Sequence, residues 1–352
     1  MADGVKKDEE YSGTQPVEER HRFDEIRLDN WMKENVEGYQ GPLVVLQFKG
    51  GQSNPTYRLD TPDRSYVMRR KPFGKLLPSA HAVDREYRVI AALGNQGFPV
   101  AKAYALCLDD SIIGAAFYIM SMEEGRVFWD PKLPSQPPED RRKIFTAKIE
   151  TLAQLHTYDP NAIGLGDFGK PGNYFARQID RWTRQYRASE TQHIPEFEKV
   201  AEWLPRTVPQ QERVSIVHGD YRLDNMIFHA TEPRVQAVLD WELSTIGDPM
   251  ADFTYMLMQW IMPGLESADL KALNIPTLEE AAQIYCNVTK TAVPDLNWYF
   301  AYNLFRMAGI TQGIAGRVRD GTAANAKAME TAKRTVPLSK VSWEYAQKAG
   351  AA

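Results

Sequence analysis

The sequence predicts an α+β protein of two lobes: a small lobe with an antiparallel β-sheet and one helix, followed by a larger, mainly helical lobe. Three observations lead to this prediction. The chain has 352 residues, enough for two hydrophobic cores. Short β-type runs separated by turn residues fill the first third, whereas apolar residues recur at helical spacing through most of the rest. The two patterns meet near Met122, so we place the first lobe at residues 23–121 and the second at residues 122–352.

The composition is typical of a globular protein, with 43% hydrophobic residues, 25% charged residues and a formal net charge of -4. The small net charge argues against extensive binding to nucleic acid or to a membrane. Residues 1–19 lack the apolar core of a signal peptide, and the longest apolar run, near residues 253–265, is too short to span a bilayer. We therefore expect a cytoplasmic protein, whose oligomeric state stays open. Cys107 and Cys286 are expected to be buried, reduced thiols.

The elements of the first lobe follow from local patterns. Residues 1–22 are polar and aperiodic and are expected to form a mobile tail. Apolar residues between Leu28 and Val36 recur at helical spacing, which predicts a helix on the outside of the lobe. Strands are predicted at residues 43–48, 56–59, 66–70, 101–108 and 115–122, and the helix of the lobe at residues 80–93.

A glycine turn joins the first two strands. Alone it indicates only a hairpin, but glycine lets backbone N–H groups approach phosphates closely. Val67 and Arg69 share a face of the next strand, where they would place an apolar residue over a base and a cation beside phosphates. Arg70 and Lys71 remain alternatives for this cation. The candidate nucleotide-binding residues here are Gly50, Gly51, Ser53, Asn54 and Arg69.

A hairpin with polar residues at one end is the most informative part of the sequence. The β-type runs at residues 226–228 and 235–239 predict this hairpin. Asp220 and Asn225 precede it, and Asp240 ends it. An Asp followed by four residues and then Asn is the spacing in which the Asp accepts the proton of an attacking hydroxyl while the Asn holds Mg²⁺. Mg²⁺ prefers oxygen ligands, so Asp240 is expected to be its second ligand.

Turns and helix caps are the ordinary alternative for these Asp and Asn residues. That alternative does not require the hairpin and the second Asp to follow in register. The motifs His218-Gly219-Asp220-Tyr221-Arg222-Leu223-Asp224-Asn225, Leu239-Asp240-Trp241-Glu242 and Gly247-Asp248-Pro249-Met250-Ala251-Asp252 together resemble the aminoglycoside phosphotransferase and choline kinase branch of the protein-kinase-like fold. The resemblance is closest to the group related to domains fused to acyl-CoA dehydrogenases, and it extends from about Phe23 onward.

This resemblance implies a bilobal kinase-like fold and transfer of the γ-phosphate of ATP, with Mg²⁺, to a hydroxyl of a small molecule. Asp220 is then the catalytic residue, and Asn225 and Asp240 are the metal ligands. Glu86 becomes the candidate partner of Arg69, although an ordinary surface pair with Arg85 or Arg88 is the alternative. The resemblance also places Met120, Ser121 and Met122 in a hinge that contacts the adenine.

Signals about the acceptor are weaker. The helix predicted from Tyr174 to about Tyr186 carries three arginines on one side. Basic helical faces are usually solvated, but if this one borders the acceptor cleft it favours an anionic acceptor. Relatives fused to acyl-CoA dehydrogenases suggest a hydroxyacid or hydroxyacyl-CoA. The residues considered for the acceptor side are Arg177, Arg181, Arg184, Arg306, Gln312 and Arg317.

Two further residues and two loop segments carry weaker signals. Asp252 is expected either to accept backbone hydrogen bonds from the catalytic loop or to cap a helix. His156 is expected to be a core histidine, and the G-x-G-x-x-G of residues 164–169 is interpreted as a loop, because that motif needs a preceding strand. Residues 244–248 are too short for a regulatory loop, which favours a small-molecule kinase over a protein kinase.

Two other functions remain open. One is a catalytically silent module that binds nucleotide, although such a module needs no proton acceptor beside two metal ligands. The other is a metal hydrolase, in which the alternating polar residues share one metal ion. Its ligands would be His218, Asp220, Asp224 and His229.

Overall fold

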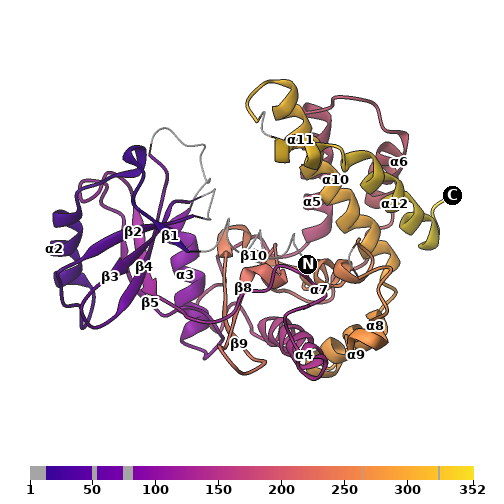
Figure 1. The fold of residues 1–352 in the computed structure, drawn as a ribbon. Coiled ribbons are helices and arrows are strands. Elements are labelled where there is room, and N and C mark those ends of the chain that lie inside the picture. Colours follow the sequence, from indigo (N-terminus) through magenta and orange to yellow (C-terminus); the bar gives the residue numbers. More distant parts are fainter. Residues whose placement is uncertain (1–12, 50–53, 74–81, 264, 324–325) are drawn as a thin grey trace.

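The two-lobed α+β architecture is confirmed. We describe the protein in a computed structural model, which covers residues 13–49, 54–73, 82–263, 265–323 and 326–352. Figure 1 shows the sheet and two helices of the first lobe on one side and the helix-rich second lobe on the other. In these described ranges no helix is long and apolar enough to cross a membrane.

The first lobe is a six-stranded sheet with a helix on each face. Its strands are antiparallel to their neighbours, in the order β1-β2-β3-β4-β6-β5. Figure 1 shows α2 on the outer face and α3 between the sheet and the second lobe. The elements are β1 (Thr14–Gln15), α2 (Glu25–Asn35), β2 (Val44–Phe48), β3 (Thr56–Asp60), β4 (Ser65–Arg70), α3 (Val83–Gly94), β5 (Ala103–Cys107) and β6 (Phe117–Ser121).

Strand alternation decides what faces the second lobe. Side chains on a strand point alternately to opposite faces. Tyr66 and Met68 of β4 are fully buried in the core under α2. Val67 and Arg69 therefore face the α3 side, where they line a cavity. The predicted pairing of these two side chains on one face is confirmed.

The expected tail must be shortened. Thr14 and Gln15 pair with the end of β2, and residues 19–21 form a short 3₁₀ helix, η1 (Glu19–His21). The carbonyl oxygen of His21 accepts hydrogen bonds from Tyr57 and Arg70. Residues 13–22 thus belong to the first lobe, because the backbone of this segment pairs with β2 and accepts hydrogen bonds from buried side chains of the sheet. Residues 1–12 lie outside the described part of the chain.

The second lobe is mainly helical and contains two short two-stranded sheets. Its longest helix, α10, packs against α5, α6, α7, α11 and α12. The helices are α4 (Pro138–Leu155), α5 (Tyr174–Ala188), α6 (Pro195–Trp203), α7 (Met250–Leu257), α8 (Leu270–Leu273), α9 (Leu278–Thr289), α10 (Asn297–Arg319), α11 (Ala326–Ala332) and α12 (Thr335–Lys348). The strands are β7 (Ser215–Val217), β8 (Met226–Phe228), β9 (Val235–Val238) and β10 (Thr245–Gly247), and the 3₁₀ helices are η2 (Leu204–Arg206), η3 (Leu223–Asn225), η4 (Trp241–Leu243) and η5 (Met258–Trp260).

Local patterns explain the second lobe well. The predicted hairpin is present as antiparallel β8 and β9, and residues 164–169 form a loop, as expected. His156 is buried at the end of α4, where its Nδ1 lies 2.6 Å from the Tyr285 hydroxyl, so it is a core histidine. Cys107 and Cys286 are buried free thiols. These confirmed predictions rest on short-range signals.

Candidate active site

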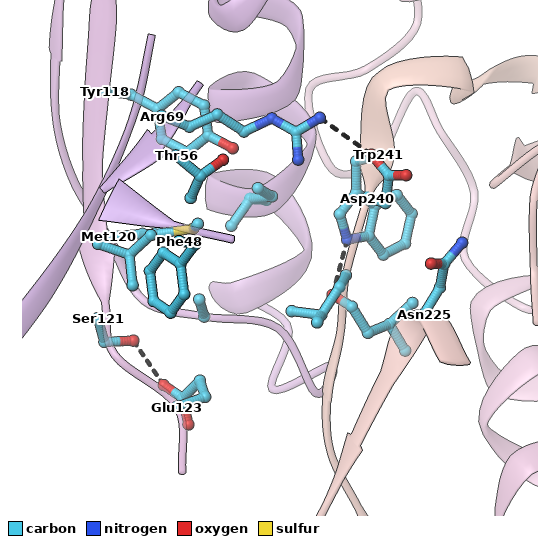
Figure 2. A pocket seen from close by; sticks show the side chains of 15 residues that line it. Phe48, Thr56, Arg69, Tyr118, Met120, Ser121, Glu123, Asn225, Asp240 and Trp241 are labelled. Carbon is cyan, nitrogen blue, oxygen red and sulfur yellow. Dashed lines mark hydrogen bonds and ion pairs between the residues drawn. The ribbon is translucent and has the colours of Figure 1, made fainter. Parts of the chain in front are cut away.

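A cavity of about 280 Å³ opens between the two lobes. Figure 2 shows side chains from β2, β3, β4 and β6 on one side of it and Asn225, Asp240 and Trp241 of the second lobe on the other. Apolar residues such as Val67 and Ile90 form much of the wall, and Figure 2 shows Arg69 and Asp240 at one end of the cavity and Glu123 at the other. The predicted site residues that line it are Arg69, Met120, Ser121, Asn225 and Asp240.

The predicted glycine turn can be placed only by its flanks. Gly50, Gly51 and Ser53 lie outside the described residues. Phe48 before the turn and Thr56 after it both line the cavity. Asn54, by contrast, is fully buried and donates its side-chain amide to Glu86 Oε1 at 2.7 Å. Asn54 thus supports the acidic residue behind the cavity and is not among the residues that line it.

Arg69 is the cation that reaches the cavity. Its guanidinium lies 3.0 Å from a carboxylate oxygen of Glu86 and 3.0 Å from one of Asp240. Its Nη2 also donates to Glu242 at 3.3 Å. Burial alone would lower the pKa of Arg69, but the three carboxylates, Glu86 foremost, raise it. Arg69 therefore joins the two lobes by linking β4 and α3 to the end of β9.

Arg70 takes no part in this cluster. It is fully buried on the opposite face of the sheet, where it donates to Tyr57, His21 and Lys71. The Phe73 ring packs against its guanidinium at 3.7 Å. Strand alternation therefore decides between the two neighbouring arginines in favour of Arg69.

Glu86 lies behind Arg69 and is only 2% exposed. The Tyr118 hydroxyl donates to its second oxygen at 3.1 Å. Burial raises the pKa of Glu86 to about 7, against the opposing charge of the neighbouring guanidinium. The alternative surface pairs are wrong, because Arg85 donates to backbone carbonyls and Arg88 pairs with Asp167.

The predicted hinge lies at the end of β6. Met120 and Ser121 line the cavity, whereas Met122 is not among the lining residues and Glu123 is. Ser121 donates its hydroxyl to Glu123 at 2.5 Å, and its backbone N–H bonds Lys102 within the sheet. The cavity-lining part of the hinge therefore ends in a carboxylate that the sequence prediction did not include.

Asp220 lies in the loop between β7 and η3, just before the β8–β9 hairpin. One carboxylate oxygen accepts from the Tyr255 hydroxyl at 2.7 Å and lies 3.2 Å from Arg222 Nε. The other oxygen accepts from the Asn225 amide at 3.1 Å. Asn225 lines the interlobe cavity, whereas Tyr255 and Arg222 line a second cavity. The residues that bond the Asp220 carboxylate thus line two different cavities.

The loop that carries Asp220 is held from behind by two buried charges. Asp252 accepts the backbone N–H groups of His218 at 2.5 Å and of Gly219 at 2.9 Å. Arg306 donates to the Gly219 carbonyl at 2.6 Å. Gly219 has φ of +88°, a conformation that glycine tolerates best. Asp252 therefore braces this loop as predicted, and Arg306 supports the same loop and is not among the residues that line the second cavity.

His218 connects the catalytic loop to Asp240. Its Nε2 lies 2.8 Å from the Leu239 carbonyl, and its Nδ1 accepts the Asp220 backbone N–H at 3.2 Å. The Leu239 N–H in turn bonds the Asn225 carbonyl. Asp240 follows with φ of +64°, a strained value for a residue with a side chain. Such strain commonly marks functional positions, and here it accompanies a carboxylate that lines the cavity.

The second cavity, of about 630 Å³, adjoins the catalytic loop on the side of Tyr255. The predicted basic helix does not line it, since Arg177 bonds backbone carbonyls and Arg184 pairs with Asp180. Arg181 lies against the Trp182 ring, and Gln312 bonds residues 189 and 191. Arg317 is not among the lining residues either. The basic residues that do line this cavity are Lys148, Arg222, Lys327 and Arg334.

The hydrolase alternative lacks its ligands. Both ring nitrogens of His218 already have backbone partners. The Nδ1 of His229 accepts backbone N–H groups of its own turn. Across the described ranges no three His, Cys, Asp or Glu side chains are grouped so that they could hold a metal ion.

Sequence reasoning missed several residues around Asp220 and Arg69. Arg222 lies within the recognised motif, so its place beside the carboxylate was open to inference. Tyr255 sits in the middle of an apolar helix and carries no local signal. Glu242 ends the motif Leu239-Asp240-Trp241-Glu242, but no local signal indicates that it pairs with Arg69 of the first lobe.

Residues 44–281 match the phosphotransferase enzyme family. A crystal structure of a protein from Ralstonia eutropha JMP134, described as a "putative aminoglycoside phosphotransferase", is 51% identical, with a TM-score of 0.87 over 93% of this chain and 99% of that one. An aminoglycoside phosphotransferase, APH(4)-Ia, in ternary complex with AMP-PNP and hygromycin B, is 14% identical, with a TM-score of 0.58 over 90% of this chain and 98% of that one. The second likeness shows the kinase-like fold alone.

Longer relatives contain most of this sequence as one part. Acyl-CoA dehydrogenase family member 10 of Mus musculus is 43% identical over 346 residues, which are 96% of this chain and 32% of that protein. Acyl-CoA dehydrogenase family member 11 of Gallus gallus is 40% identical over 351 residues, which are 96% of this chain and 45% of that protein. The chain thus spans less than half the length of these relatives.

Proposed function

The chain belongs to the phosphotransferase enzyme family, and on that premise we propose that it transfers the γ-phosphate of Mg·ATP to a hydroxyl group of a small molecule. One observation carries the proposal. The carboxylate of Asp220 is bonded by Asn225 of the interlobe cavity and by Tyr255 of the second cavity. A nucleotide in the first cavity and an alcohol in the second would meet at this group.

The interlobe cavity suits a nucleotide. Its apolar wall around Val67 and Met120 matches the faces of a base, and Arg69 at the charged end is permanently cationic and matches phosphate. The Ser121 N–H is already bonded within the sheet, so the backbone of Met122 and Glu123 is left to meet the adenine edge. The glycine turn, Gly50, Gly51 and Ser53, is proposed to cover the phosphates.

Asn225 and Asp240 suit Mg²⁺. Both line the interlobe cavity and offer an amide oxygen and a carboxylate, the hard oxygen donors that this ion prefers. When bound, Mg²⁺ would neutralise charge on the transferred phosphate. Arg69, now 3.0 Å from Asp240, would release that carboxylate to the metal and turn to the phosphates.

Asp220 is proposed to act as the general base. Its oxygens already accept hydrogen bonds from Tyr255 and Asn225, which orient the carboxylate. Phosphoryl transfer depends mainly on positioning and charge neutralisation, so these few side chains suffice. Asp252 and Arg306, which hold the loop from behind, keep Asp220 at a defined place relative to Asn225.

The acceptor is proposed to be anionic. Among the described residues, four basic ones line the second cavity and one acidic one, Asp224, lies beside them. The relatives that contain this sequence are named acyl-CoA dehydrogenase family members. A hydroxyacid or a hydroxyacyl-CoA therefore fits both the charge of the cavity and this association better than a polycationic aminoglycoside.

A screen for ADP release tests the proposal. The purified chain is incubated with ATP and a panel of hydroxyacids, hydroxyacyl-CoA thioesters, aminoglycosides, choline and sugars, with Mg²⁺ or with excess EDTA. We expect Mg²⁺-dependent ADP formation with at least one hydroxylated anion, and a phosphorylated product by mass spectrometry. Nucleotide binding without ADP formation on any alcohol would favour a silent binding module instead.

Asp240→Asn is expected to weaken Mg²⁺-dependent nucleotide binding. Even residues that only support metal ligands typically contribute 10–100-fold to metal affinity, so the Kd for Mg·AMP-PNP should rise by at least about tenfold. Without Mg²⁺ the loss should vanish, because the carboxylate then only repels the phosphates. Calorimetric titration at several Mg²⁺ concentrations measures both. An unchanged Mg²⁺ dependence would exclude Asp240 as a ligand.

A further inference from the structure

Lys148 is a buried lysine at the second cavity, and the function proposed above gives it no role beyond its share of the positive charge there. It comes from the core helix α4, is only 1% exposed and lines the cavity. Its Nζ donates to Gln259 Oε1 at 2.6 Å, which is the one hydrogen bond recorded for this ammonium in the described ranges. An ammonium group has three donors, and burying it beside a single neutral partner is costly. Such a group is poised for an anion.

Gln259 presents a second unsatisfied donor at the same place. Its amide oxygen faces Lys148 when that lysine is protonated, because the opposite orientation would then place two donors against each other. The orientation of the amide is thus determined by the lysine. The Nε2 of Gln259 is buried and has no hydrogen-bond partner within the described part of the chain. Buried polar atoms are rarely left unpaired, so this one also points to a missing ligand.

Apolar side chains line the same cavity as this pair. Tyr221, whose hydroxyl bonds the Lys148 carbonyl, connects the helix to the catalytic loop. A carbon chain lying along the apolar wall would end at Lys148 and Gln259, with Asp220 reached through Tyr255 and Arg222. The apolar wall includes Trp129, Pro131, Met256, Met258, Met262 and Met307.

We propose that Lys148 and Gln259 together bind a negatively charged oxygen group, a carboxylate or a phosphate, of the acceptor whose hydroxyl is presented to Asp220. The pair is then a specificity determinant that favours anionic over neutral alcohols. This inference rests on the proposed function, since it names what the second cavity holds.

Binding of an anion should also draw a proton to Lys148. Burial lowers the pKa of Lys148 to about 7, with Asp224 opposing this shift and Arg222 adding to it. A bound anion favours the charged form, so acceptor binding near neutral pH is accompanied by proton uptake. The other charged or titratable groups that line the cavity are Arg222, Asp224, Tyr221, Tyr255, Lys327 and Arg334.

Calorimetric titration of matched probes tests the inference. The probes are medium-chain hydroxycarboxylic acids, the methyl esters of the same acids, and hydroxyalkyl phosphates of similar length, each added to the chain with Mg·AMP-PNP. We expect the acids or the phosphates to bind at least about tenfold more tightly than the esters, since buried charge pairs contribute strongly to selectivity. Comparing the two anion series identifies which group is preferred.

Lys148→Met should abolish this preference. Methionine keeps most of the side-chain volume without the charge, so the acids should weaken by at least about tenfold while the esters change little. Proton uptake, measured in two buffers of different ionisation enthalpy, should disappear. Lys143→Met, at an exposed position of the same helix, is the matched control and should behave as the wild type.

Gln259→Glu is a second variant, which tests the inference even if Lys148→Met fails to fold. The new carboxylate would pair with Lys148 and compete with the ligand, so anions should bind more weakly and proton uptake should again be lost. Equal binding of acids and esters, no binding of any probe, or wild-type acid binding by Lys148→Met would overturn the inference.

The results also separate this inference from the proposed function. Lys148-dependent binding of acids without any ADP formation would refute phosphotransfer and retain the anion site. Turnover of neutral alcohols, with kinetic constants unchanged in Lys148→Met, would refute the anion site and retain phosphotransfer.

Discussion

Replacing Asp220 with alanine is expected to lower kcat by about a thousandfold, because general-base catalysis contributes typically 10²–10⁴-fold. Alanine removes the proton acceptor without placing an amide donor against Tyr255 or Asn225, as asparagine would. Nucleotide affinity should stay within about twofold, since the interlobe cavity is lined by other residues. Single-turnover kinetics and AMP-PNP titration measure the two quantities.

The matched control for Asp220→Ala is Asp180→Ala. Asp180 lies exposed on α5, where its carboxylate pairs only with an exposed arginine, and such pairs contribute little. This control should retain wild-type kcat. If Asp220→Ala turned over within about tenfold of the wild type, Asp220 would be excluded as the base. Catalysis would then depend on the residues that position the reactants.

Replacing Asp252 with alanine is expected to cost roughly 3 kcal/mol or more of the free energy of unfolding, because each buried donor left unsatisfied costs about 1–3 kcal/mol. The carboxylate is fully buried and accepts two backbone N–H groups of the catalytic loop. Turnover should fall as well, since Asp220 follows those two residues directly. Urea denaturation and kcat measurements test both parts.

The effect of Asp252 should also depend on pH. Burial alone would raise the pKa of Asp252, but His156 and the Gly219 N–H hold it below its usual range. A carboxylate with a lowered pKa contributes stability above the pKa of the unfolded chain, near 3.8, and loses it as the pH falls through the folded pKa. The difference between wild type and variant should therefore be constant near neutral pH and shrink on acidification below about pH 4.

Asp269→Ala serves as the comparison for that stability loss. Asp269 accepts one exposed backbone N–H at the start of α8, and removing such a cap costs about 1 kcal/mol. If Asp252→Ala cost no more than Asp269→Ala, the carboxylate would not be bracing the catalytic loop.

Much of the fold was predictable from local patterns. The helix from Leu28 to Val36, the strands of the first lobe and the hairpin before Asp240 all follow from apolar periodicity and turn residues, which depend on neighbours a few positions away. The errors lie where such signals fail. Residues 13–22 are polar and resemble a tail, yet their backbone completes the sheet and satisfies Tyr57 and Arg70.

The sequence by itself identified Asp220, Asn225 and Asp240 as one candidate group, because the three residues flank a single short hairpin. It also determined the kinase-like fold through motifs of the same kind. The tertiary structure alone decided which arginine faces the cavity, because only the packing of α2 shows which face of β4 is buried in the core.

The tertiary structure alone also revealed the side-chain pairs that join distant segments of the chain. Asp252 reaches the catalytic loop across 34 positions, and Lys148 meets Gln259 across 111. The side chains of such pairs come together only when helices pack, and no spacing in the chain announces them. The second cavity is therefore formed by packing of distant segments, whereas Asp220, Asn225 and Asp240 come from one short stretch of the sequence.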